Sequence, residues 1–147
     1  MNITIPDSVT IIGYGVFHGC SSLTSITIPN GVTTIGVYAF HYCSSLTSIT
    51  IPDSVISIGD YAFYECSSLT SVTIPDSVTE IGGHAFNRCT SLEEVYCKPT
   101  TPPAGDSYMF DNNALGRKIY VPAESVEAYK SAVNWKSYAD YIKPYNF

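Results

Sequence analysis

Cysteines recur along this chain at a constant interval of 23 residues, at Cys20, Cys43, Cys66 and Cys89. A fold with this period stacks them in one column, with neighbours about 4.7–4.9 Å apart. A disulfide between parallel side chains is strained, and zinc favours converging pairs such as C-x2-C. The sequence therefore favours cysteine as a small apolar filler of the core, and Cys97 is interpreted in the same way.

Histidine occurs twice at the same interval. His18 and His41 share one column, and two stacked imidazoles can in principle hold a metal ion. No third ligand lies in this column, because His84 belongs to the neighbouring one. The sequence therefore favours a solvated histidine pair.

Aspartate forms another column, with Asp7, Asp53 and Asp76. A row of carboxylates suits calcium, but the capping of turns accounts for the same residues without a metal. We therefore expect neither a metal site nor a cofactor.

Arrangements of residues that support catalysis are missing from the sequence. It has no phosphate-binding glycine loop, no nucleophile elbow and no carboxylate pair placed for acid–base chemistry. Serine pairs such as Ser67-Ser68 recur in the repeats, where they serve a turn, and no histidine or aspartate shares their column. We therefore expect that the protein is not an enzyme.

Two exposed faces remain as candidates for binding. The outward face of the predicted strands carries one column of residues, Thr27, Thr50, Thr73, Tyr96 and Tyr120. The other broad face carries Tyr38, Tyr42, Tyr61, Tyr64 and His84. Twelve tyrosines are many for 147 residues, and exposed aromatic rings anchor protein interfaces and sugar contacts. We predict that these ten residues include the binding site.

A unit of 23 residues positions all of these columns. Val72 and Ile74 share one face of a short strand, which Pro75 ends because it cannot donate a ladder hydrogen bond. A second extended piece follows on the opposite side of the coil. Eight apolar positions per unit point inward, in one copy Val55, Ile58, Ala62, Phe63, Cys66, Leu69, Val72 and Ile74.

Two local features follow from the same unit. Gly82 is expected to supply a positive φ, which other residues avoid. Ala85, Phe86 and Cys89 have the spacing of a single helical turn that faces inward.

The solenoid is expected to span residues 1–121, with repeats near 1–22, 23–45, 46–68 and 69–91 and a degenerate one at 92–121. In this last repeat Phe110 keeps the phenylalanine column one residue late, and residues 119–122 supply the closing strand. The pattern then predicts a helix over 123–133 and a second, short one over 135–142. Residues 122–147 are therefore predicted to be a helical cap, which covers the open end of the core.

The N-terminal end has no matching cap. A strand over Ile3–Ile5 would leave an open edge, and Ile11, Ile12 and Phe17 an open layer of the core. Because open edges recruit other chains, we expect a homodimer through this end, or further repeats upstream.

Charge and hydropathy exclude other classes of partner. The net charge is −6, and the seven Lys and Arg residues form no run, so nucleic acid is not expected to bind. No apolar run has the length of a membrane span. No signal peptide is visible, and the chain begins inside a repeat unit.

The unit Ile-Pro-Asp-Ser-Val-x-x-Ile-Gly-x-x-Ala-Phe-x-x-Cys-Ser-Ser-Leu-Thr-Ser-(Ile/Val)-Thr resembles the BspA-like class of leucine-rich repeats, closely over about residues 3–98 and loosely over 99–121. The resemblance implies an α/β solenoid, a right-handed coil of about five 23-residue repeats with one parallel strand per repeat and a C-terminal helical cap. It also implies a bacterial protein that is secreted or displayed on the cell surface, often an adhesin for host matrix proteins or other cells.

The leading functional hypothesis is a non-catalytic module that recognises a protein ligand. The alternatives are a structural spacer without a ligand of its own, and a carbohydrate-binding module.

Overall fold

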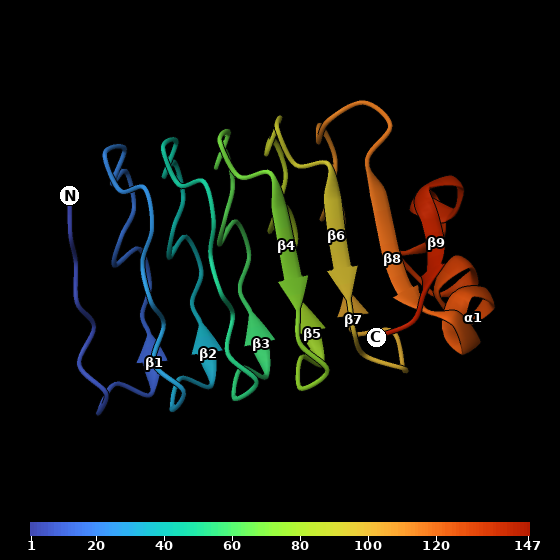
Figure 1. The fold of residues 1–147 in the computed structure, drawn as a ribbon, viewed down its shortest axis with the longest axis horizontal. Coiled ribbons are helices and arrows are strands. Elements are labelled where there is room, and N and C mark those ends of the chain that lie inside the picture. The colour runs from blue at the N-terminus through green and yellow to red at the C-terminus, as the bar shows by residue number, and fades with distance from the viewer.

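The computed structural model covers residues 1–147 and shows a solenoid in which successive repeats stack as coils (Figure 1). The coils run from the N-terminus at one end to the short helix α1 (Val126–Ser131) at the other. Two parallel sheets follow the long axis of the solenoid. The predicted fold, a parallel-strand solenoid of leucine-rich-repeat type with a short C-terminal helix, is confirmed.

One sheet is built from two-residue strands. In spatial order these are β1 (Ile11–Ile12), β2 (Thr34–Ile35), β3 (Ser57–Ile58), β5 (Glu80–Ile81) and β7 (Ala104–Gly105). The other sheet contains β4 (Ser71–Ile74), β6 (Glu94–Cys97), β8 (Lys118–Pro122) and β9 (Ile142–Tyr145). Earlier coils contribute to this second sheet only through a single parallel bridge between Thr27 and Thr50.

The C-terminal tail differs from the two predicted helices. The 3₁₀ helix η1 (Ala123–Ser125) leads into α1, and a second 3₁₀ helix, η2 (Lys136–Tyr141), follows. Ile142, predicted to lie in the second helix, instead begins β9 and pairs in parallel with Ile119 of β8. The free edge of β8 offers backbone partners, and Ile142 buries its side chain there. The strand β9, rather than β8, therefore closes the sheet.

A single core of 37 buried hydrophobic residues runs through the coils. Phenylalanine rings of successive coils stack with their centroids 5.1–5.5 Å apart, from Phe17 to Phe110. All eight inward positions predicted for one repeat, from Val55 to Ile74, are at most 2% exposed. The predicted core columns are confirmed, including the one-residue shift at Phe110.

The buried cysteines bond as well as fill space. Each thiol donates to the phenylalanine carbonyl of the preceding coil, at 3.1–3.2 Å, with Cys43 bonded to Phe17, Cys66 to Phe40 and Cys89 to Phe63. Asn113 and Arg117 donate in the same way to Phe86 and Phe110, at 2.8 and 2.9 Å. Burial raises the pKa of Cys43 to about 12, so its thiol stays protonated and able to donate.

The glycine column has a different cause from the one predicted. Gly82 does not have a positive φ. A Cβ atom on Gly82 would lie 2.4 Å from the backbone nitrogen of Asp60, and a Cβ on Gly59 or Gly36 would lie 2.6 or 2.7 Å from backbone atoms of the preceding coil. On Gly13, in the first coil, it would meet only a side-chain methyl group at 3.4 Å. Glycine is needed because the coils approach each other too closely for a side chain.

The predicted helical turn at Ala85–Cys89 is wrong. The segment consists of consecutive turns, closed by bonds such as Cys89 N–H to Phe86 O at 3.4 Å. Alternate N–H groups leave the coil, as Phe86 N–H does when it donates to Met109 O of the next coil at 2.9 Å. Because the ladder between coils uses these donors, an α-helical pattern cannot form.

Candidate binding surfaces

Nine aromatic rings form a continuous surface, which we call the aromatic ladder. Its members are Tyr14, His18, Tyr38, His41, Tyr42, Tyr61, Tyr64, His84 and Tyr108. Tyr61 stacks between Tyr38 and His84, with centroid distances of 5.2 and 4.6 Å. In the adjacent column His41 stacks on Tyr64 at 5.0 Å. The five residues predicted on this face lie side by side, and the structure adds four rings to them.

The backbone beneath the ladder is left-handed at residues other than glycine. Tyr38 and Tyr61 have φ of 59° and 56°, and Gly15 holds the same column in the first coil at 60°. Tyr42, with φ of 61°, is matched by Gly19 at 71°. A left-handed conformation costs a non-glycine residue roughly 1–2 kcal/mol. The chain therefore keeps tyrosine at positions where the backbone favours glycine.

The histidine pair is more enclosed than predicted. The rings of His18 and His41 stack at 4.9 Å, with their Nδ1 atoms 3.1 Å apart, so one nitrogen donates to the other. His41 is buried and also contacts the ring of Tyr42 at 4.1 Å. Burial, and then the charge of His18, lower the pKa of His41. The prediction of a solvated pair is therefore wrong for His41.

The aspartates of the third column are exposed at the turns. The side-chain bonds to the turn come instead from the serine that follows: Ser54 and Ser77 donate to Val32 O and Val55 O, both at 2.7 Å. This column therefore lies on the surface without holding the coils together.

The sheet face carries the other predicted column. Thr27 pairs with Thr50, and in the later coils Thr73 pairs with Tyr96 and Tyr96 with Tyr120. These five residues therefore form one row, whose small hydroxyl side chains give way to large rings near the C-terminal end.

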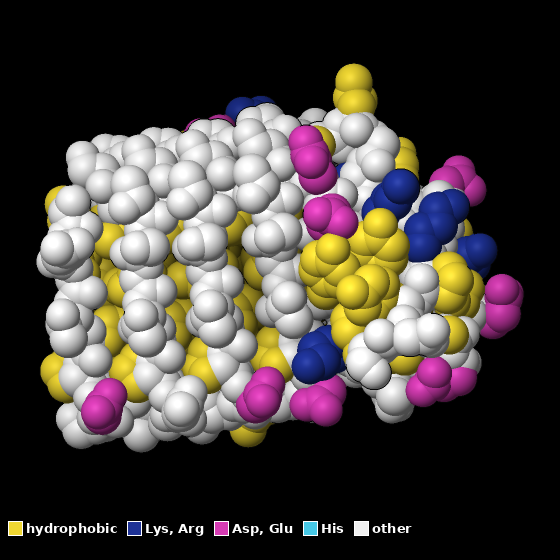
Figure 2. Space-filling model, in the orientation of Figure 1, with side chains coloured by type: hydrophobic (Ala, Val, Ile, Leu, Met, Phe, Trp, Pro, Cys, Tyr) yellow, Lys and Arg dark blue, Asp and Glu magenta, His cyan; other side chains and the backbone are white.

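Four rings gather at that end, and we call them the aromatic patch: Tyr96, Tyr120, Tyr145 and Phe147. Tyr96 stacks on Tyr120 at 5.1 Å, and Tyr145 meets both of them at 5.3 and 5.4 Å. Figure 2 shows hydrophobic side chains gathered on this face at the position of β6 and β8. Tyr145 and Phe147 are 42% and 50% exposed, so the patch is open to a partner.

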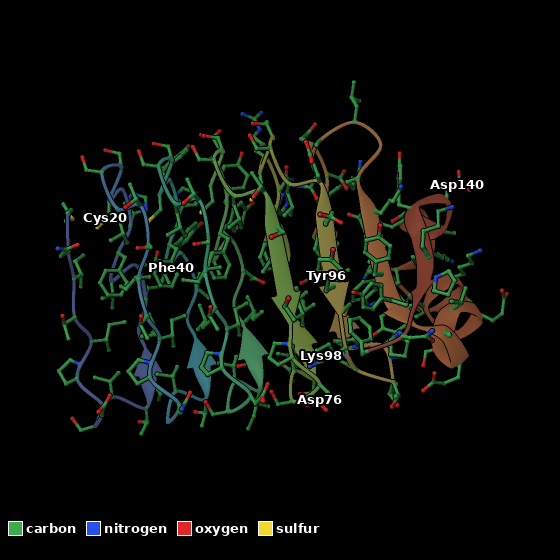
Figure 3. All side chains as sticks on the ribbon, viewed as in Figure 1. Cys20, Phe40, Asp76, Tyr96, Lys98 and Asp140 are labelled. Carbon is green, nitrogen blue, oxygen red and sulfur yellow. The ribbon has the colours of Figure 1, made fainter.

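Charged groups border the aromatic patch. Tyr96 donates from its hydroxyl to the Glu94 carboxylate at 2.7 Å, and this bond raises the pKa of Tyr96 to about 12. Lys98, near Tyr96 in Figure 3, is exposed, and so is Lys143, which pairs with Tyr120. An aromatic centre with a charged rim is the usual anatomy of a protein interface.

Several residues of these surfaces escaped prediction for identifiable reasons. A step of 23 residues from His84 ends at Ser107, whereas Tyr108 is the residue that contacts His84, at 5.0 Å. The late position of Phe110 already signalled this shift. Tyr145 was missed because residues 142–145 were not recognised as a strand.

The N-terminal end also differs from expectation. Residues Ile3–Ile5 form no strand. Apolar side chains are nevertheless open there: Met1, Ile11 and Val16 are each more than half exposed. The open end is therefore made of loose apolar side chains, without an ordered strand edge.

No helix in residues 1–147 has the length and apolar character needed to cross a membrane. A leucine-rich repeat protein of T. pallidum has a similar structure, with a TM-score of 0.73 and 29% identity over 82% of this chain and 57% of that one. A leucine-rich cell surface protein of Faecalibacterium prausnitzii gives a TM-score of 0.50 and 25% identity over 96% of this chain and 46% of that one. The chain thus spans about half the length of each. No relative among curated proteins matches the sequence.

The BspA type leucine-rich repeat region matches residues 1–116 in six copies, where the sequence spacing predicted about five. The match covers most of the chain and coincides with the stacked coils. The chain therefore belongs to the BspA-type leucine-rich repeat family.

Proposed function

We propose that this chain is a non-catalytic protein-recognition module of the adhesion type, secreted or displayed on a bacterial cell surface. The similarity to the cell surface protein of F. prausnitzii supports this location. Proteins of this repeat family are typically non-catalytic, and the solenoid offers the two aromatic surfaces for binding.

The aromatic patch is the proposed contact site, and its exposure is the observation that carries the proposal. Tyrosine is enriched among the residues that dominate binding energy in protein interfaces. On the rest of the sheet face the outward column carries threonine, as at Thr50 and Thr73. A partner that covers the patch therefore gains apolar contact at the rings and polar contact along the row.

The chain supplies matched replacements for testing this site. Tyr96 and Tyr120 occupy the column that holds Thr73 one coil earlier, so Tyr96→Thr with Tyr120→Thr keeps a residue that the fold accepts. Tyr38→Gly with Tyr61→Gly does the same for the aromatic ladder, because Gly15 occupies that column. The two double variants separate the two faces without disturbing the core.

The experiment immobilises the intact chain and screens it against extracellular-matrix proteins and mucins. We expect saturable binding that weakens at least about tenfold in the patch variant, since interface hot spots contribute on this scale. Weakening in the ladder variant alone would move the site to the other face. If the folded wild-type chain binds no protein, the spacer hypothesis replaces this proposal, and binding of glycans alone would favour a carbohydrate-binding module.

A further inference from the structure

A hollow of about 500 Å³ lies where the last repeat meets the C-terminal tail, apart from the aromatic patch. Its lining includes Tyr108, Asp111, Asn112, Arg117, Asn134 and Tyr141. We propose that this hollow binds a sugar that carries a carboxylate, such as a hexuronic acid. This inference concerns a small ligand and does not depend on the proposed protein recognition.

Arg117 supplies the reason for a negative charge on the ligand. Its guanidinium lies 4.1 Å from the ring centroid of Tyr141, and Nη2 donates to Phe110 O at 2.9 Å. The Nε atom is buried and has no hydrogen-bond partner. The one ion pair of the chain joins Arg88 to Glu65, so no carboxylate of the protein neutralises Arg117. A largely enclosed cation with an unused donor is suited to an incoming carboxylate.

The other polar groups are placed to accept hydrogen bonds from hydroxyl groups. Asn112 and Asn134 use their Nδ2 groups to donate to Asn87 Oδ1 and Gly105 O, both at 3.0 Å. These bonds fix both amides and leave each Oδ1 as an acceptor. Asp111 accepts from the Tyr138 hydroxyl through Oδ1 at 2.6 Å, and its second oxygen has no partner within the protein.

The combination of one cation with several acceptors selects the ligand class. A simple carboxylate would pair with Arg117 but would leave Asp111 and the amide oxygens without donors. A neutral sugar would satisfy the acceptors and leave Arg117 without an anion. Tyr108, at the rim and 55% exposed, adds an aromatic face for the C–H groups of a sugar ring. An acidic sugar meets all three requirements.

The test is a titration of the intact chain with sodium glucuronate, followed by isothermal calorimetry and amide NMR shifts, with glucose and acetate as comparison ligands. We expect saturable binding of glucuronate, at least about tenfold tighter than either comparison ligand, because a bond to a charged group contributes on this scale. The shifts should centre on residues 107–117 and 134–141.

Three variants identify the groups involved. Arg117→Gln should weaken binding about tenfold or more, whereas Arg88→Gln, which alters an exposed arginine outside the hollow, should leave it unchanged. Asn112→Gly should also weaken binding and should fold normally, because Gly19 holds the same left-handed column in the first coil. This variant keeps the test decisive if Arg117→Gln unfolds.

Each other result overturns part or all of the proposal. Equal binding of glucose would remove the role of the carboxylate, and equal binding of acetate would remove the sugar. No binding of glucuronate by the folded wild-type chain, or wild-type affinity in Asn112→Gly, would overturn the site.

Discussion

Gly59→Ala is expected to separate two explanations of the glycine column. In the structure the added Cβ would lie 2.6 Å from Val37 N and 2.7 Å from Gly36 C, in the preceding coil. Ordinary van der Waals contact begins at 3.4 Å, so the coils would have to separate by several tenths of an ångström. The backbone resists this separation because Gly59 N–H donates to Ile35 O at 2.8 Å, at the same junction.

The expected cost follows from these contacts. Overpacking against atoms that must move costs roughly 1–3 kcal/mol, and weakening one or two hydrogen bonds between coils adds about 1 kcal/mol each. Replacement of glycine by alanine returns about 0.4–1 kcal/mol through the unfolded chain. We therefore expect Gly59→Ala to lower the free energy of unfolding by about 3 kcal/mol.

Gly13→Ala is the matched control. Gly13 holds the same column, but its added Cβ would meet only a methyl group of Val16 at 3.4 Å, because no coil precedes it. We expect its free energy of unfolding to stay within about 1 kcal/mol of wild type. Urea denaturation followed by circular dichroism measures both variants. Equal losses in the two variants would refute the close-approach argument and would favour a conformational requirement shared by the whole column.

Three further predictions concern the core, the histidines and the open end. Phe63→Ala should cost roughly 3–5 kcal/mol in the same denaturation assay, because it leaves a cavity in the ring stack, and a loss below about 1 kcal/mol would contradict the stacking. The pKa of His41 is lowered from 6.5 in the folded state, so the unfolded chain binds protons more readily below pH 6.5 and stability should fall as the pH drops through this value. His41→Tyr, which copies Tyr64 of the next coil, should reduce that fall in melting temperature, and an unchanged pH dependence would argue against His41 as the titrating group. Light scattering should detect a homodimer that Ile11→Ser and Val16→Ser dissociate, whereas a monomeric wild type at high concentration would exclude pairing through the open end.

The repeat made most of the fold accessible from sequence. Because Phe40, Phe63 and Phe86 recur at one interval, their column, and the inward positions around it, could be assigned without coordinates. Tyr38 and Tyr61 could be placed side by side on the surface by the same argument. Periodicity identifies which residues are neighbours, and these predictions needed nothing more.

Features that depend on distances or on local backbone conformation were beyond this reasoning. The need for glycine at Gly82 is visible only from the separation of two coils. The tail was misjudged because Ile142 follows the free edge of β8 and not its own helical pattern. The hollow around Arg117 joins parts of the chain with no shared period, so no column pointed to it.

The thiol ladder links the chemistry of this chain to its folding kinetics. The five cysteines are free, and all except the half-buried Cys20 are enclosed in the core. A protonated, enclosed thiol reacts slowly, because oxidation proceeds through the exposed thiolate. In an oxidising medium the coils thus act as a protecting group for four sulfur atoms. Oxidative damage then becomes limited by the rate at which coils open, and fraying at the first coil exposes Cys20 before the others.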